Sequence, residues 1–335
     1  MTAMASNHTV LVAAQAGDEH AFVQLTAPYR QPLHRHCYRI LGSMHDADDA
    51  LQETLIRAWR GIDRFQPRAA LSAWLYRIAT NVCLRMLEQR ARGAGAPIDA
   101  HLEPYPDRLL DDLPSQSPGP EETVEERERI GLAFVTAMQL LPAKQRVTLV
   151  LRDVLDWPAQ EVADLLGDSV PAVNSALQRG RERIRRERHE GSLARTHQPV
   201  DAAAEARVMR RFQDAWEAVD IDGIVALLAD DALLTMPPEA LRFEGSAQIG
   251  AFFATAPLEG HLERIQLVPV RANRQPALAA YADEHGEGVL EAYGVMVFAL
   301  RGDRIDGITG FPRDPALFKR FGLSTKLAAT PALPD

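Results

Sequence analysis

Hydrophobic residues recur at intervals of three and four from about residue 21 to residue 90, which predicts amphipathic helices. Around residues 46–60 the buried stripe would consist of Ala47, Ala50, Leu51, Thr54, Leu55, Ala58 and Trp59. Ser43, with Asp46 three residues later, has the spacing of a capping box and predicts the start of this helix. A second helix is predicted from about Ala70 to Gln89.

The helical pattern stops after residue 92, where glycines, prolines and acidic residues replace it. We expect a flexible acidic linker at residues 93–125, because such a stretch is long for a connection inside one compact domain. Helices resume and continue to about Arg188. Pro158 opens a short helix that Gly167 ends, and Pro171 lies at the start of the next helix, which is the pattern of a helix-turn-helix.

The last third of the chain changes from helical to strand-like periodicity. An amphipathic helix with Val208, Phe212 and Trp216 on one face precedes several runs of alternating or continuous hydrophobic residues. These predicted strands are 232–236, 265–271, 277–281, 289–300 and 304–310. The fold class is therefore multidomain: two all-α helical modules followed by an α+β domain.

The formal net charge of −9 over 335 residues argues, as a bulk number, against a nucleic-acid binder. By segment, residues 1–92 carry +3 and 130–190 carry +1, whereas 93–129 carry −7 and 191–335 carry −6. The acid thus lies outside the two helical modules. With only Cys37 and Cys83, and with no apolar run long enough to span a membrane, we expect a cytoplasmic protein with reduced thiols and no membrane partner.

Two motifs resemble a known family. The stretch Asp46-Ala-Asp-Asp-Ala-Leu-Gln-Glu-Thr54 and the residues that follow it resemble region 2 of sigma-70-family transcription initiation factors, and residues 140–183 resemble region 4. Two regions joined by a linker are typical of extracytoplasmic-function (ECF) sigma factors. The remainder resembles a SnoaL-like domain, also called the nuclear-transport-factor-2-like cone, as in ECF subgroups of the sigma-G and sigma-J kind.

The resemblance implies two partners, core RNA polymerase and promoter DNA. Asp48, Asp49, Gln52 and Glu53 would dock on the clamp helices of the polymerase large subunit, with the polymerase flap region as a further contact. Residues implied for the opened −10 element are Arg68, Arg77, Asn81 and Arg85. Those implied for the −35 element, on the second helix of the helix-turn-helix, are Asn174, Ser175, Gln178, Arg179, Arg181 and Arg183.

The cone implies an apolar pocket with an unidentified small ligand, lined by Trp216, Met236, Phe243, Tyr281 and Tyr293. No spacing singles out a catalytic pair among Asp231, His261, Glu291 and Asp306, so we expect no enzymatic activity and no cofactor. His34, His36 and Cys37 do not converge on one helix face, so we expect no metal site.

These observations predict a sigma factor that the fused SnoaL-like domain regulates. The predicted boundaries are 8–92 for region 2, 93–125 for the acidic linker, 126–190 for region 4, 191–204 for a second linker and 205–325 for the SnoaL-like domain. Two alternatives remain open at this point. One is a ligand-responsive helix-turn-helix regulator, and the other is a SnoaL-type isomerase or cyclase with an appended DNA-binding arm.

Overall fold

The computed structural model describes residues 2–66, 70–92, 102–111, 130–189, 194–198, 200–239 and 241–328. The chain forms two compact units. The first contains Met1–Ala96 and Ala137–Glu187, and the second contains Pro97–Thr136 and Arg188–Asp335. No described helix is long and apolar enough to cross a membrane.

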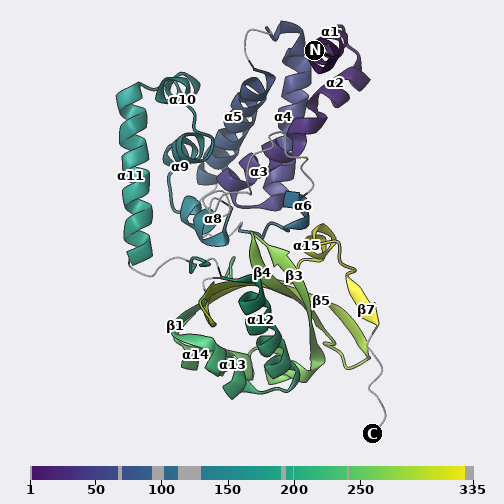
Figure 1. Cartoon of the computed structure of the whole chain (residues 1–335), viewed down its shortest axis with the longest axis vertical. Helices are drawn as coiled ribbons and strands as arrows, with labels where there is room; N and C mark the ends of the chain where they lie inside the picture. The colour runs from purple at the N-terminus through teal and green to yellow at the C-terminus, as the bar shows by residue number, and fades with distance from the viewer. Residues whose placement is uncertain are drawn as a thin grey trace. The chain divides into compact units, whose positions relative to one another are not determined.

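The amino-terminal part of the first unit is helical, as its periodicity predicts (Figure 1). Its helices are α1 Thr2–Gln15, α2 Glu19–Thr26, α3 Arg30–Leu41, α4 Met44–Gly61 and α5 Leu71–Arg92. Helices α3, α4 and α5 pack on one another. The Ser43 side chain accepts a hydrogen bond from the Asp46 backbone N–H at 3.1 Å and so caps α4, whereas the Asp46 carboxylate pairs with Arg90 of α5.

The second part of this unit holds the helix-turn-helix. Its helices are α9 Ala143–Leu149, a π-helical turn Val150–Val154, α10 Ala159–Leu166 and α11 Val170–His189. Helix α8, Leu132–Gln139, precedes them, and the division between the units falls within it, after Thr136. Gly167 adopts a left-handed conformation with φ of 64° and ends α10, which agrees with the sequence prediction. On α11 the buried residues Val173, Leu177 and Gly180 follow helical spacing, so the polar side chains between them face outward.

A buried arginine joins the two parts of the first unit. The Arg146 guanidinium on α9 donates to the Ile40 carbonyl of α3 at 2.8 Å. It also donates to the Gln139 side-chain and backbone oxygens at 2.6 and 2.8 Å, and to the Leu141 carbonyl at 3.1 Å. Gln139 in turn lies against Gly42, where a Cβ would meet its amide at 2.7 Å and where φ is +78°. Only glycine fits this position.

The second unit is built on a twisted sheet (Figure 1). Its strands are β1 Leu228–Thr235, β2 Arg242–Glu244, β3 Ile265–Ala272, β4 Gln275–Ala282, β5 Val289–Arg301, β6 Arg304–Pro312 and β7 Lys326–Ala328. Their order is β2-β1-β6-β5-β4-β3, with β7 paired to β5. Strands β1 and β6 run parallel, and the other pairs are antiparallel. The five predicted strands are present, and the short β2 and β7 add to them.

Helices α12 Ala202–Glu217, α13 Ile221–Leu227 and α14 Ser246–Thr255 cover one face of the sheet. Phe212 and Trp216 of α12 pack there with Phe253 of α14 and Phe298 of β5 to form the aromatic centre of the core. Because strand side chains alternate, Ala277, Ala279 and Val297 point to the opposite face. We call these the helix-covered face and the outer face.

The outer face is buried by segments from elsewhere in the chain. Leu132 and Arg195 lie beside Val297, Ala299 and Thr309. Helix α15, Pro315–Arg320, places Phe318 against Tyr281, with their ring centroids 5.0 Å apart. The segment 194–198 also follows the sheet, since the Gln198 N–H donates to the Leu300 carbonyl at 2.9 Å and the Leu300 N–H donates to His197 Nδ1 at 3.1 Å.

The described part of the predicted acidic linker is ordered rather than flexible. Residues 102–111, which end in α6, Arg108–Asp111, attach to the turn between β3 and β4. Asn273 in this turn is fully buried; its side chain accepts from the Tyr105 N–H and donates to the Ile130 carbonyl, both at 2.8 Å. The composition of this stretch predicts a solvent-exposed segment. Hydrogen bonds to buried polar groups of the sheet instead hold residues 102–111 in place. Residues 93–101 and 112–125 of the predicted linker lie outside the described residues. We call residues 102–111 the docked segment.

Candidate nucleic-acid and polymerase interfaces

Helix α4 presents an acidic face. Ala47, Ala50, Thr54 and Ala58 are buried against its neighbours, which turns Asp48, Asp49, Gln52 and Glu53 away from the core. Asp49 is 58 % exposed and lies 3.8 Å from His45, and Glu53 accepts from Arg57 at 2.6 Å. The structure thus brings all four predicted docking residues together on one rigid helix.

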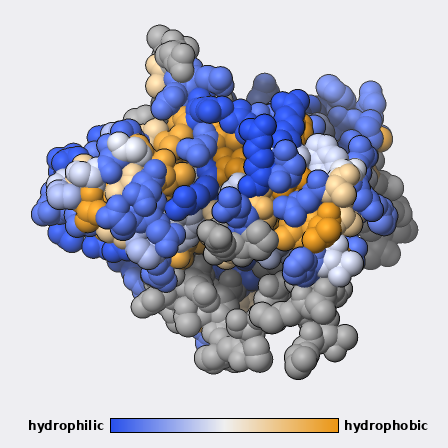
Figure 2. All heavy atoms as spheres, turned by 90° about the horizontal axis from the view of Figure 1, so that it is seen from above, coloured by the Kyte–Doolittle hydropathy of each residue, from blue (hydrophilic) through white to orange (hydrophobic). Residues whose placement is uncertain are grey.

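An exposed apolar residue extends this face, and the sequence prediction missed it. Ile56 is 37 % exposed, and it follows Gln52 and Glu53 by one helical turn. Val12 of α1 and Val23 of α2 are also exposed hydrophobic residues. In Figure 2, hydrophobic residues lie at the surface between hydrophilic ones. A face that combines short acidic side chains with an exposed aliphatic one is suited to protein docking. Its signal in the sequence is an isoleucine on the polar side of the helical stripe.

The residues predicted for the −10 element lie on α5, with one exception. Arg77, Asn81 and Arg85 follow one another at intervals of four and form a stripe on which Asn81 and Arg85 are exposed. Arg68 lies outside the described residues. Trp74 packs on Phe65, with ring centroids 5.0 Å apart, so it supports the fold of the chain before α5.

Tyr76 faces the interior rather than this stripe. Its ring meets His36 edge-on at 5.1 Å, and burial raises the pKa of its hydroxyl. A hydrogen bond of 2.8 Å joins His36 Nε2 and the Thr80 hydroxyl. Burial, with the nearby Arg39 charge as a smaller cause, lowers the pKa of His36 to about 3, so its ring is neutral at physiological pH. Both side chains are therefore part of the packed interior of the first unit.

The predicted −35 residues lie on the outward side of α11. Asn174, Ser175, Gln178 and Arg179 are exposed near the amino-terminal half of the helix, which is the part that a helix-turn-helix inserts into the major groove. Gln178 donates to Glu182 one turn later at 3.0 Å. Arg183 is partly buried and lies 3.9 Å from Glu187.

Two neighbouring arginines of α11 differ in their partners. Arg181 makes a bidentate ion pair with Asp153, at 3.0 and 2.6 Å, and this pair raises its pKa. Arg179 is exposed, two residues earlier, and points away from the buried side of the helix. To reach a phosphate, Arg181 must first leave its carboxylate, whereas Arg179 carries its charge at the open surface.

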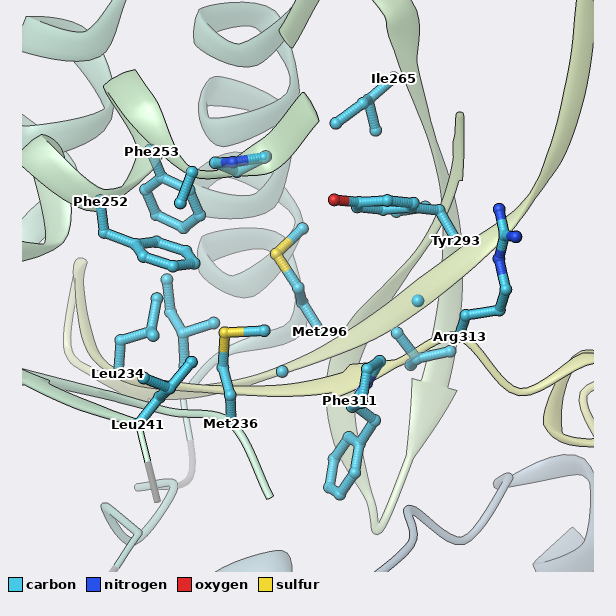
Figure 3. A pocket seen from close by; sticks show the side chains of 18 of the residues that line it. Leu234, Met236, Leu241, Phe252, Phe253, Ile265, Tyr293, Met296, Phe311 and Arg313 are labelled. Atoms are coloured by element: carbon cyan, nitrogen blue, oxygen red, sulfur yellow. The ribbon is translucent and has the colours of Figure 1, made fainter. Parts of the chain in front are cut away.

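The second unit has a cavity of about 470 Å³, partly open to solvent, between the helix-covered face and helices α12 and α14. Trp216, Met236 and Tyr293 line it, as predicted, together with Phe252 and Met296 (Figure 3). Phe243 does not line the cavity; it packs on Phe252, with ring centroids 4.7 Å apart.

Tyr281 is placed on the opposite side of the sheet from the cavity, which corrects the prediction. Its neighbours Ala280 and Ala282 belong to the helix-covered core, so strand alternation turns Tyr281 to the outer face. There its hydroxyl donates to the Ser324 carbonyl at 2.7 Å. The sequence shows an aromatic residue in a strand but does not show which face it takes.

The ionisable candidates of the cone lie away from the cavity. Asp231 and Asp306 both pair with Arg301, the second at 2.8 Å, and Glu291 pairs with Lys326 at 2.7 Å. His261 lies 2.9 Å from Glu263 and is exposed. Arg301 lowers the pKa of Asp231, while burial raises the pKa of Asp306. Among the described residues no group of three or more His, Cys, Asp or Glu side chains could hold a metal ion.

Three family profiles match the chain. Sigma-70 region 2 matches residues 25–93, Sigma-70 region 4 matches residues 131–184, and the SnoaL-like domain matches residues 209–307. The helical regions with their exposed faces thus define a sigma-70-family transcription initiation factor that carries an additional domain.

Similarity to whole proteins narrows the family. The chain is 38 % identical over 322 residues to the ECF RNA polymerase sigma factor SigG of Mycobacterium tuberculosis, with 90 % of this chain and 84 % of SigG covered. It is 30 % identical over 172 residues to SigW of Bacillus subtilis, which covers 51 % of this chain and 90 % of SigW. The crystal structure of the M. tuberculosis sigma factor SigJ has the same fold, with a TM-score of 0.59, 24 % identity, and coverage of 88 % of this chain and 97 % of SigJ.

The chain belongs to the ECF sigma factors of RNA polymerase. It is therefore a promoter-recognition and transcription-initiation factor and not an enzyme. This assignment decides against the two alternatives left open by the sequence.

Proposed function

We propose that α4 docks this chain on the clamp helices of the large polymerase subunit, through Asp48, Asp49, Gln52 and Glu53, with Ile56 at the edge of the contact. The second part of the first unit would meet the flap region. Exposed carboxylates on a rigid helix favour a specific, salt-sensitive contact with a basic surface. Binding to polymerase places the working protein in the cytoplasm.

On promoter DNA, α5 would contact the opened −10 strand through Arg77, Asn81 and Arg85, and α11 would enter the major groove of the −35 element. The names −35 and −10 give positions about 25 base pairs apart, which is about 85 Å at about 3.4 Å per base pair. In the first unit, however, α5 contacts α9. The free chain therefore has to separate these parts before it can bind both elements.

We further propose that the SnoaL-like domain regulates this separation by holding the connecting chain. The observation that carries the proposal is the Asn273 side chain, which binds Tyr105 on one side of the connection and Ile130 on the other. Asp107 adds a second attachment: its carboxylate accepts from the Arg274 N–H at 2.8 Å and from Arg271 at 3.3 Å. Arg108 donates to the Arg320 carbonyl of α15 at 2.6 Å. While these contacts are made, the docked segment cannot extend.

Transcription in vitro tests the regulatory proposal. The full chain and its Asn273→Gly variant would be compared with core polymerase on a promoter identified by mapping transcript starts in cells that overproduce the protein. Glycine keeps the left-handed backbone of the turn, where φ is +56°, and removes only the amide. We expect more transcript from the variant at equal holoenzyme concentration. Equal transcript from both proteins would refute the regulatory role and leave the family assignment intact.

Core binding tests the α4 interface separately. Asp49→Asn removes a carboxylate from the acidic face, and Asp63→Asn, which removes an equally exposed carboxylate beyond the end of α4, is the matched control. We expect the first variant to lose affinity for core polymerase at moderate salt and the second to retain it. If both variants keep the same affinity for core polymerase, the docking surface does not include Asp49.

A further inference from the structure

The cavity of the SnoaL-like domain has the composition of a ligand site rather than of a packing defect. Its volume of about 470 Å³ is within the range of small-molecule sites, about 300–1,000 Å³. Figure 3 shows Met236 and Met296 pointing into the same space, with Phe252 and Phe253 on one side and Tyr293 on the other. Thioethers and aromatic rings form a soft, polarisable wall that adapts to an apolar molecule.

We infer that this cavity binds a neutral, largely apolar organic molecule, and that its occupancy is coupled to the docking of residues 102–111. The second part rests on the regulatory role proposed above; the first part does not.

The charged side chains that line the cavity, Glu239, Glu284 and Arg313, disfavour an anionic ligand. The Trp216 N–H donates to the Ile265 carbonyl at 3.2 Å, so this wall offers no donor to a ligand. The Tyr293 hydroxyl end points toward the interior and supplies one hydrogen bond. Arg313 is held by Glu284 at 2.6 Å and by the Ala292 carbonyl at 3.2 Å. An anion in the cavity would therefore lie beside carboxylates and an arginine that is already paired, and desolvating an unpaired charge is costly.

A short stretch of chain connects the cavity to the docked segment. Residues 310–313, at the end of β6 and directly after it, line the cavity (Figure 3). Helix α15 begins at Pro315, with Asp314 as its cap, and its last carbonyls accept hydrogen bonds from Arg108. A ligand that shifts the end of β6 thus moves the attachment point of the docked segment.

A matched pair of dyes tests the ligand class. N-phenyl-1-naphthylamine is neutral and fluoresces in apolar surroundings, and 8-anilinonaphthalene-1-sulfonate has the same aromatic skeleton with a sulfonate added. Titration of the full chain should show saturable binding of the neutral dye at one site. The anionic dye should bind about tenfold more weakly or less, because its charge finds no free partner. Equal affinity for both dyes would overturn the neutral class.

Two variants locate the binding. Ala280→Phe fills the cavity from a buried strand position, and Leu241→Trp narrows it from a residue that is 40 % exposed and so tolerates a larger side chain. Val289→Phe adds similar apolar area at an exposed position of β5 outside the cavity and is the control. We expect Leu241→Trp and, if it folds, Ala280→Phe to weaken binding of the neutral dye about tenfold, and Val289→Phe to leave it unchanged. Unchanged binding to Leu241→Trp would place the dye elsewhere and overturn the site.

Hydrogen exchange tests the coupling. The Tyr105 and Asp107 amides donate to Asn273 and to the Arg271 carbonyl in the docked state, and both become exchangeable on release. The saturating neutral dye should change their exchange rates about fivefold or more. Bound dye without a change at these amides would overturn the coupling but not the site. Neither assay uses polymerase, so failure here is distinct from failure of the transcription experiment.

Discussion

Two buried polar side chains, one in each unit, hold segments that are distant in the sequence. Arg146 joins α9 to α3 in the first unit, and Asn273 joins the docked segment to the sheet in the second. Both lie beside a left-handed turn: Gln139, a partner of Arg146, packs on Gly42, and Asn273 is itself the first residue of the turn between β3 and β4. Each of the two side chains binds backbone groups of a segment that is distant in the sequence.

The two anchors differ in charge, and the difference determines how firmly each holds. Burial lowers the pKa of Arg146 to about 10, with the nearby Arg90 charge as a second cause, so the guanidinium remains charged at neutral pH. It donates to oxygen atoms of Ile40, Gln139 and Leu141, and hydrogen bonds from a charged donor are stronger than neutral ones. Asn273 is neutral, and each of its two side-chain bonds has the strength of an ordinary amide bond. We infer that the Asn273 contacts alone are weaker than the Arg146 contacts.

The largest predicted effect follows from removing the charged anchor. Arg146→Met keeps the length of the aliphatic stem and leaves the Ile40, Gln139 and Leu141 carbonyls without their donor. We expect the free energy of unfolding of the first unit to fall by about 3 kcal/mol. Lys144→Met on the same helix is the control, since it breaks only an exposed ion pair with Asp168. Denaturant unfolding followed by helical circular dichroism measures both, and equal stability of the two variants would show that Arg146 is not the anchor.

A smaller effect is expected for the neutral anchor. Asn273→Gly removes two hydrogen bonds to the buried Tyr105 and Ile130 while the backbone of the turn is retained. We expect a loss of about 2 kcal/mol, and faster tryptic cleavage after Arg108, which is exposed in the docked segment. Asp303→Gly in the exposed turn between β5 and β6 controls for added glycine. Unaltered cleavage at Arg108 would mean that other contacts hold the segment.

The first unit should also respond to acid where the Asn273 anchor does not. The folded-state pKa of His36 is about 3, below its ordinary value of 6.5, so below pH 6.5 the unfolded chain binds a proton that the folded chain does not. Stability therefore falls as pH decreases, by about 1.4 kcal/mol per pH unit between pH 6 and pH 4. His36→Gln should flatten this slope, and His45→Gln, at an exposed position, should not. Urea unfolding at pH 7 and pH 5 distinguishes them; parallel slopes in all three proteins would exclude His36 as the cause.

The sequence predicts the elements of this protein better than its long-range contacts. The α4 stripe, the Ser43 cap and the Gly167 turn depend on neighbours within a few residues, and all three are present. The docked segment is different, because its order comes from Asn273, which lies 168 residues from Tyr105. Composition records only that the segment is acidic and rich in proline. The Asn-Arg pair between two predicted strands is a turn signal, but nothing local shows what the turn holds.

The candidate site residues also differ in whether the sequence could predict their positions. The exposed residues on α4 and α11 could be predicted, because periodicity determines which side of a helix is buried. The positions of Tyr281 and Phe243 could not, because they depend on strand alternation and on packing between aromatic rings. Ile56 was missed because an aliphatic residue at one exposed position breaks the polar pattern only once.

The smallest predicted effect distinguishes two arginines on α11 that the sequence treats alike. Arg179→Ala removes a charge at the open surface, so the affinity of holoenzyme for a −35 element should fall by about 1 kcal/mol, and the slope of log affinity against log salt should decrease by about 0.9. Arg181→Ala should do less, because Asp153 already binds this guanidinium at 2.6 Å and the pair would have to break before a phosphate is reached.

The variant Asp153→Ala completes the comparison. Freeing Arg181 from its carboxylate should strengthen binding to the −35 element and steepen the salt dependence, and the double variant Asp153→Ala with Arg181→Ala should lose that gain. Fluorescence anisotropy with a labelled −35 duplex at several salt concentrations measures the parent chain and all four variants. If Arg181→Ala costs as much as Arg179→Ala in the parent chain, the ion pair does not restrain Arg181 at the DNA, and both arginines would then be equivalent phosphate contacts.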